Sequence, residues 1–153
     1  MRVENRLAEL GLELPRTPIP VGHYLGYRQV GDLLFLGGVV ANPNGEQRFE
    51  GKVGAEVTLE EGIEAARLCA LNHLAILSDA LGDLDRVDYL VKLVGYVNAA
   101  PGFTDMPKVL NGASDLFIEV FGEAGRHARA ALGVASLGRE HPVETELIVR
   151  IHP

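Results

Sequence analysis

The sequence predicts an α+β sandwich in which one β-sheet is backed by two long helices. Three observations predict this fold: five short apolar runs typical of strands, two longer stretches with helical periodicity, and no shift in composition that would divide the chain. The expected order is β-β-α-β-α-β-β, preceded by a short helix. Because 153 residues is the size of one ordinary domain, we assign residues 1–153 to a single domain.

The first elements are a short helix and a hairpin. Apolar residues recur at helical spacing from Val3 to Leu10, which predicts an amphipathic helix that ends at Gly11. Two strand-like runs follow, Tyr24–Val30 and Leu33–Val40. The two-residue joint between them contains glycine and predicts a tight hairpin.

The first long helix carries the strongest local signal. Thr58 and Glu61 form a capping-box pattern, in which each side chain satisfies a backbone N–H of the other residue. Apolar residues at helical spacing then continue until Gly82, where we expect the helix to end. Tyr89–Val97 is rich in valine, leucine and tyrosine and predicts a buried strand.

The second half of the chain predicts one more helix and two more strands. Thr104 or Asp105 is expected to cap a helix that runs to Phe121. The strands are expected at His127–Ala135 and Val143–Ile151. One face of the last strand is apolar and the other is mixed, so a homo-oligomer packed through its sheets is expected.

Composition excludes several classes of protein. The chain has 21 acidic and 14 basic residues, a net charge of −7, which disfavours a nucleic acid as its main partner. It has one cysteine, so it forms no internal disulfide. It contains no apolar run of membrane-spanning length and no export signal, so we expect a cytoplasmic protein without membrane contact.

The standard sequence motifs for nucleotide binding, metal binding and a serine nucleophile are absent. The glycine-rich stretches lack the spacing of a Walker A or dinucleotide-binding fingerprint, and no HExxH, paired CxxC or GxSxG occurs. The five histidines lie far apart, so we expect neither a metal site nor a cofactor. Cys69 and His73, inside the first long helix, are interpreted as an inert thiol and an ordinary histidine.

Arg129 is the candidate with the most informative surroundings. In a strand, Arg129 shares one face with Ala131 and Gly133, and such small neighbours leave a hollow beside the guanidinium. The planar fork of donors suits a carboxylate ligand. Alternatively, Arg129 pairs with an acidic residue of its own or a neighbouring chain, and the local pattern leaves both interpretations open.

Four further residues are candidates, each with a plainer alternative. Glu144 could orient or deprotonate a water molecule, or it could be a solvated carboxylate, like Glu146 on the same strand face. Tyr24 could line the same hollow or pack as a core aromatic. Gly38, in a glycine pair, could bring its backbone N–H close to a ligand or form a bulge. Asn111 could be an ordinary surface amide.

Two sets of motifs resemble the Rid family, formerly called YjgF, of enamine and imine deaminases. The early set is Gly22-His23-Tyr24, Gly31-Asp32 and Gly37-Gly38. The late set is Ala128-Arg129-Ala130, Leu137-Gly138 and Val143-Glu144-Thr145-Glu146. The spacing agrees without a gap, and the resemblance covers almost the whole chain.

This resemblance implies a chorismate-mutase-like fold and a homotrimer with clefts between subunits. It implies hydrolysis of 2-aminoacrylate-like enamines and imines to 2-oxo acids and ammonia, without a cofactor. Arg129 would bind the carboxylate of the small 2-imino or 2-oxo acid, and Glu144 would be the acid near the hydrolytic water. Tyr24 would line the cleft, Gly38 would offer backbone contacts, and Asn111 matches after a shift of one residue.

The sequence also departs from the family pattern. His23, Gly37, Ala131 and Gly138 replace the usual proline, serine, cysteine and second proline. The resemblance is closest to a longer branch, whose members carry names such as putative endoribonuclease or translation initiation inhibitor. A non-catalytic trimeric sensor of small carboxylate metabolites is therefore the alternative function. Endoribonuclease activity is disfavoured because the chain is acidic and shows no basic stripe.

Overall fold

A computed structural model describes residues 2–153 and confirms the predicted order of elements. The helices are α1 (Val3–Glu9), α2 (Leu59–Leu81) and α3 (Met106–Phe121). The strands are β1 (Tyr27–Val30), β2 (Leu33–Val40), β3 (Val87–Asn98), β4 (Ala128–Val134) and β5 (Val143–Ile151). Short 3-10 turns are formed by Pro43–Gly45, Leu84–Arg86, Gly122–Gly125 and Gly138–Glu140.

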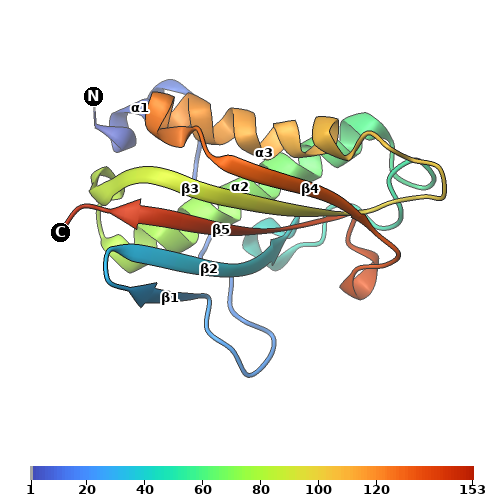
Figure 1. Ribbon diagram of the computed structural model, residues 1–153, viewed down its shortest axis with the longest axis horizontal. Coiled ribbons are helices and arrows are strands. Elements are labelled where there is room, and N and C mark those ends of the chain that lie inside the picture. The colour runs from blue at the N-terminus through green and yellow to red at the C-terminus, as the bar shows by residue number, and fades with distance from the viewer. Residues whose placement is uncertain (1) are drawn as a thin grey trace.

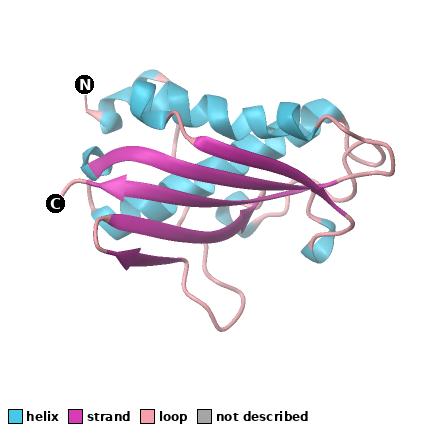
Figure 2. Ribbon diagram, in the orientation of Figure 1, coloured by secondary structure: helices cyan, strands magenta, loops and turns pink. Residues whose placement is uncertain are grey.

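The five strands form one mixed sheet in the order β1-β2-β5-β3-β4. All neighbouring strands are antiparallel except β3 and β4, which are joined by the crossover through α3 and run parallel. Both long helices lie on the same side of the sheet (Figure 1, Figure 2). The fold is therefore the predicted α+β sandwich, with one sheet face covered by helices and one face open.

Helix α2 has both of its predicted ends. The Thr58 hydroxyl accepts from the Glu61 N–H at 3.1 Å, and the Glu61 carboxylate accepts from the Thr58 N–H at 3.0 Å. Gly82 ends the helix with a φ of 75°, a left-handed conformation that glycine adopts without strain. This capping box is the clearest local sequence signal in the chain, and it is confirmed.

The interior of α2 holds Cys69 and His73 against β5, and both are fully buried. Burial raises the pKa of the Cys69 thiol, which keeps it protonated and unreactive. His73 Nε2 bonds the Thr145 hydroxyl at 2.9 Å, and burial lowers the pKa of the ring to about 3. The predicted burial of Cys69 is confirmed, and His73 is packed in the core.

The start of the first strand and the capping of α3 differ from the prediction. The first strand begins at Tyr27 rather than Tyr24, because residues 21–24 bend after Pro20. Tyr24 therefore lies in a loop before the strand. Asp105 occupies the cap position of α3, yet its side chain makes no capping hydrogen bond; its carboxylate instead lies 3.9 Å from the Lys108 amine.

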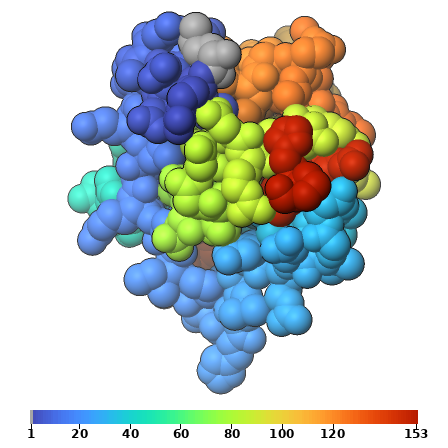
Figure 3. All heavy atoms as spheres, turned by 90° about the vertical axis from the view of Figure 1, so that its left-hand side faces the viewer, coloured from blue at the N-terminus to red at the C-terminus, as the bar shows by residue number. Residues whose placement is uncertain are grey.

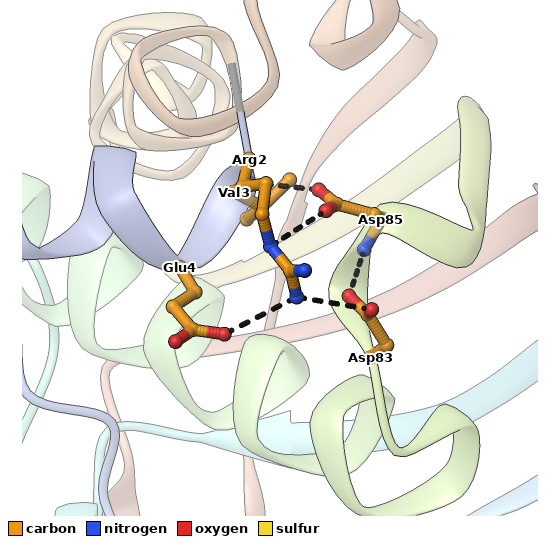
Figure 4. Close-up of polar contacts among 5 residues, drawn as sticks. All are labelled: Arg2, Val3, Glu4, Asp83 and Asp85. Carbon is orange, nitrogen blue, oxygen red and sulfur yellow. Dashed lines mark hydrogen bonds and ion pairs between the residues drawn. The ribbon is translucent and has the colours of Figure 1, made fainter.

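Helix α1 is attached to the segment that precedes β3. The Arg2 guanidinium lies 3.2 Å from the Asp83 carboxylate and 3.4 Å from that of Asp85 (Figure 4). The Val3 N–H donates to Asp85 at 2.8 Å, so the first turn is fixed to the segment before β3. Leu7, on the apolar side of this short helix, is buried.

The loop before β1 projects from the body of the molecule, at the bottom of Figure 1 and Figure 3. It carries the most exposed large apolar side chains of the described residues, Ile19 (85%) and Val21 (91%). Apolar side chains are also exposed on the open face of the sheet, including Phe35 and Leu132. Within residues 2–153, no helix is both long and apolar enough to cross a bilayer.

Candidate functional site

Arg129 lies on the edge strand β4 and reaches back over the start of α3. Its Nη1 donates to Asn111 Oδ1 at 2.8 Å and to Ser114 Oγ at 3.1 Å. Its Nη2 donates to the Pro107 carbonyl at 3.3 Å. All three acceptors are neutral, and no carboxylate within residues 2–153 forms an ion pair with Arg129. The guanidinium is therefore positioned but keeps its charge uncompensated.

His127 extends this arrangement by one residue. Its Nδ1 lies 2.7 Å from the Gly125 carbonyl, which can only accept, so Nδ1 carries the proton. Burial, followed by the charge of Arg129, lowers the pKa of His127, which favours a neutral ring. The Nε2 atom then accepts from the Ser114 hydroxyl at 2.9 Å, and the Ser114 oxygen accepts from Arg129. Ser114 is thus held from both sides.

A cavity of about 250 Å³ adjoins this cluster, between α3 and β4. We call it the arginine cavity; it is lined by Asn111, Ser114, Asp115, Ile118, Arg126, His127 and Arg129. The space beside Arg129 was expected from Ala131 and Gly133, but helix α3 provides most of its walls. Asn111, matched to the family only after a shift of one residue, is in direct contact with Arg129.

Glu144 lies on β5 against a bulge in β2. The pairing of β2 with β5 shifts by one residue between Leu36 and Val39, so Gly37 and Gly38 form the bulge. A Cβ atom placed on Gly38 would lie only 2.7 Å from Glu144 Oε2. The missing side chain at Gly38 is therefore what allows the carboxylate to lie against the β2 backbone.

The surroundings of Glu144 favour its protonated form. Half-burial is the larger cause of its raised pKa, and the neighbouring Glu146 carboxylate is the second cause. Glu146 accepts a short hydrogen bond from the Tyr96 hydroxyl, which holds its charge beside Glu144. A carboxyl group with a raised pKa is a stronger base than an ordinary one and is suited to exchange protons with water.

A cavity of about 280 Å³ lies beside Glu144 and is formed mainly by loops. We call it the glutamate cavity; it is lined by Val21, Tyr24, Gly38, Val40, Asn42, Gly45, Gln47, Gly138, Arg139, His141 and Glu144. The structure therefore brings together three of the candidates, Tyr24, Gly38 and Glu144. It places the other two, Arg129 and Asn111, in the arginine cavity.

The two cavities lie on opposite faces of the sheet. Leu93 on β3 pairs with both Arg129 and Leu147, and Leu93 and Leu147 are buried under the helices. Tyr96, three residues later, pairs with Glu144 on the open face. Side chains of paired residues point to the same face, so Arg129 and Glu144 do not meet within one chain.

Sequence reasoning missed three residues at these cavities. Ser114 and His127 anchor Arg129, and Arg139 lines the glutamate cavity. Periodicity could have placed Ser114 one helical turn after Asn111 and on its face, but not against β4. Residues 2–153 contain no group of three or more acidic, histidine or cysteine side chains that could hold a metal ion.

Comparison with known proteins identifies the family. A family model described as "YjgF/chorismate mutase-like, putative endoribonuclease" matches residues 4–138. The chain belongs to the YjgF (Rid) family. The predicted family and the predicted chorismate-mutase-like fold are both confirmed.

Relatives of this YjgF-family protein match it over nearly their whole length. Protein TCP17 of Trypanosoma cruzi is 43% identical over 152 residues, 99% of this chain and 95% of the relative. The crystal structure of a putative endoribonuclease from Shewanella oneidensis is 36% identical, with a TM-score of 0.95 over 99% of this chain and 100% of that one. A protein of unknown function from Agrobacterium tumefaciens is 41% identical, with a TM-score of 0.91 over 98% and 92% of the two chains.

Proposed function

We propose that this YjgF-family protein hydrolyses 2-imino and 2-enamino acids to 2-oxo acids and ammonia, in a cleft completed by two copies of the chain. One observation carries the proposal: the Arg129 guanidinium is fixed by neutral acceptors, is not ion-paired within residues 2–153, and adjoins a cavity. A fixed, uncompensated guanidinium beside open space is what binding of a small carboxylate requires.

Arg129 would bind and orient the substrate. Its three protein bonds occupy both Nη1 hydrogens and one Nη2 hydrogen. The Nε–H and the second Nη2–H are left as a pair that one carboxylate can bridge. Binding the carboxylate at two points would place the imine carbon in one orientation, which supplies the entropic part of the rate gain.

Glu144 would move the protons. Its carboxylate takes a proton from water as the water oxygen bonds to the imine carbon. The electron pair of the C=N bond moves to nitrogen, which receives that proton from Glu144. The tetrahedral carbon then carries a hydroxyl and an amine. Glu144 then takes the hydroxyl proton and delivers it to nitrogen, so that the C=O bond forms as the C–N bond breaks and nitrogen leaves as ammonia. A carboxyl group with a raised pKa supports both directions of transfer.

A shared cleft follows from where the two groups lie. Arg129 and Glu144 are on opposite faces of the sheet, so one catalytic unit that uses both needs a second chain. The exposed apolar residues Phe35 and Leu132 on the open face supply a surface for packing against another copy. We propose the homotrimer as this assembly.

The test is turnover of 2-aminoacrylate combined with mixing of two inactive variants. The wild type should release 2-oxo acid and ammonia, whereas Arg129→Ala and Glu144→Gln should each be inactive. When the two variants are co-expressed, random assembly should restore about a quarter of the wild-type activity, since some clefts then receive both intact residues.

Two results would overturn this proposal. If 2-oxo acids raise the melting temperature of the wild type without any turnover of imines, the protein is a carboxylate sensor rather than a hydrolase. If the wild type is active but the mixed variants are not, the site does not combine Arg129 of one chain with Glu144 of another. Folded variants, verified by circular dichroism, are the control for both results.

A further inference from the structure

A third cavity, of about 310 Å³, opens beside the glutamate cavity. It lies between residues 16–21 of the loop before β1 and the turns at Pro43–Gly45 and Gly138–Glu140. We call it the turn cavity. Asn42 and Arg139 line both this cavity and the glutamate cavity, so the two spaces are neighbours.

The residues that line the turn cavity differ in charge from the chain as a whole. Its lining includes two arginine residues, Arg16 and Arg139, and none of the residues 2–153 that line it is acidic. The whole chain, by contrast, carries a net charge of −7. Neither arginine forms an ion pair within the described chain. Two uncompensated guanidinium groups around one cavity form a local site for an anion.

The two turns that border the turn cavity, Pro43–Gly45 and Gly138–Glu140, contain non-glycine residues in the left-handed conformation. Asn44, Arg139 and Glu140 have φ values of 57°, 54° and 57°, and they are the left-handed non-glycine residues of the described chain. Such residues cost free energy and persist where the surrounding structure enforces them, which occurs most often at functional sites. All three lie in the two turns that border the turn cavity.

Hydrogen bonds hold both turns in place. The Arg16 N–H donates to Asn44 Oδ1 at 2.9 Å, and Arg16 Nη2 donates to the Asn44 carbonyl at 2.8 Å. Gln47 Nε2 donates to the Arg139 carbonyl at 2.8 Å and so connects one turn to the other. These contacts fix the backbone of both turns, and none of them involves the Arg139 guanidinium.

We infer that Arg139, assisted by Arg16, binds a second carboxylate at the far end of the substrate, so that dicarboxylic 2-imino acids are the preferred substrate class. This inference rests on the proposed function. The imine carbon would lie at Glu144, the first carboxylate at Arg129 of a neighbouring copy, and the side-chain carboxylate in the turn cavity. The adjoining spaces around Glu144 and Arg139 provide the path between these positions.

The test compares imines that differ in their side-chain charge. The 2-imino acids of alanine and of glutamate are generated in situ by an amino-acid oxidase, and KM is measured for each. Arg139→Gln should raise KM for the dicarboxylic imine about tenfold and change KM for the monocarboxylic imine much less. Arg139→Lys should recover part of the loss, because an ammonium group keeps the charge without the fork.

Two further variants sharpen the comparison. Arg16→Gln should raise the same KM by a smaller factor, since its guanidinium already donates to Asn44. Arg86→Gln, an exposed arginine in the turn before β3 and outside all three cavities, is the matched control and should change neither KM. An equal KM change for both imines, or no change in either, overturns the inference.

Binding measurements separate this inference from the proposed function. If the wild type hydrolyses neither imine, but 2-oxoglutarate raises its melting temperature more than 2-oxobutanoate does and Arg139→Gln removes the difference, the hydrolase proposal fails and the carboxylate site is supported. If succinate stimulates hydrolysis of the monocarboxylic imine instead of competing with the dicarboxylic one, the site binds a separate carboxylate. That result overturns the assignment of substrate class.

Discussion

The arginine cavity and the glutamate cavity are built in different ways. Arg129 is positioned by side chains: Asn111, Ser114 and, through Ser114, His127 fix its guanidinium. Glu144 is positioned by backbone, because the bulge in β2 leaves room for its carboxylate where a side chain at Gly38 would stand. Activity should therefore be most sensitive to substitutions that remove side-chain atoms at the arginine cavity, and to substitutions that add them at the glutamate cavity.

The largest effect should come from the group at the centre of the arginine cavity. Arg129→Ala removes the carboxylate-binding fork, and we expect kcat/KM for 2-aminoacrylate to fall by at least about a hundredfold. The melting temperature should change little, because the residue is half-exposed and lies on an edge strand. The kcat/KM of Arg129→Lys should also remain low, because an ammonium group lacks the fork of donors. A fully active Arg129→Ala protein would exclude this role for the arginine.

In the glutamate cavity, the corresponding change adds a single methyl group. Gly38→Ala would place a Cβ 2.7 Å from Glu144 Oε2 and displace the carboxylate, which is the flexible end of its side chain. We expect kcat/KM to fall about tenfold with little loss of stability. Gly37→Ala is the matched control: its Cβ would meet only backbone oxygens at 3.6 Å or more. Equal effects of the two variants would refute this account of the bulge.

A smaller effect is expected when the anchor of Arg129 is weakened. Ser114→Ala removes one of three acceptors of the guanidinium and leaves His127 Nε2 without its donor. We expect kcat/KM to fall about fivefold and the free energy of unfolding to fall by about 1 kcal/mol. Kinetics and chemical denaturation measure the two losses. Ser78→Ala, on the far helix α2, controls for loss of a hydroxyl and should not affect turnover.

The smallest change concerns pH. The charge of Glu146 is the second cause, after burial, of the raised pKa of Glu144. Glu146→Gln removes that charge, so the pKa of Glu144 falls and the group remains a competent base at lower pH. The acidic limb of the kcat/KM profile should therefore move to lower pH. Glu4→Gln, an exposed acid on α1, should leave the profile where it is. A shift to higher pH would contradict the proposed role of Glu144 as the base.

Local sequence signals were sufficient to predict most of the fold. The capping box at Thr58, the stop at Gly82 and the strand Val143–Ile151 depend on residues close in sequence, and all three agree with the structure. Tyr24 was misplaced because its segment is apolar, and periodicity does not distinguish a short strand from a bent loop after proline. Its position depends on tertiary contacts.

The candidate site could be predicted in part. Alternation along β4 and β5 separates the two faces of each strand, but only the pairing through β3 shows that Arg129 and Glu144 face opposite ways. The family resemblance suggested Asn111 as a site residue but not its contact with Arg129, and the roles of Ser114 and His127 were missed. Their role depends on how α3 packs on β4, which no local pattern encodes.

The separation of the two cavities along the chain has a consequence for folding. Asn111 and Arg129 are 18 positions apart, within one strand-helix-strand crossover, so their contacts form after a short loop closure. Gly38 and Glu144 come from opposite halves of the chain and meet only when the last strand inserts between β2 and β3. We therefore expect the contacts of Arg129 to form early in refolding and those of Glu144 to form late. In pulsed hydrogen exchange, the amides of α3 should become protected before those of the β2 bulge.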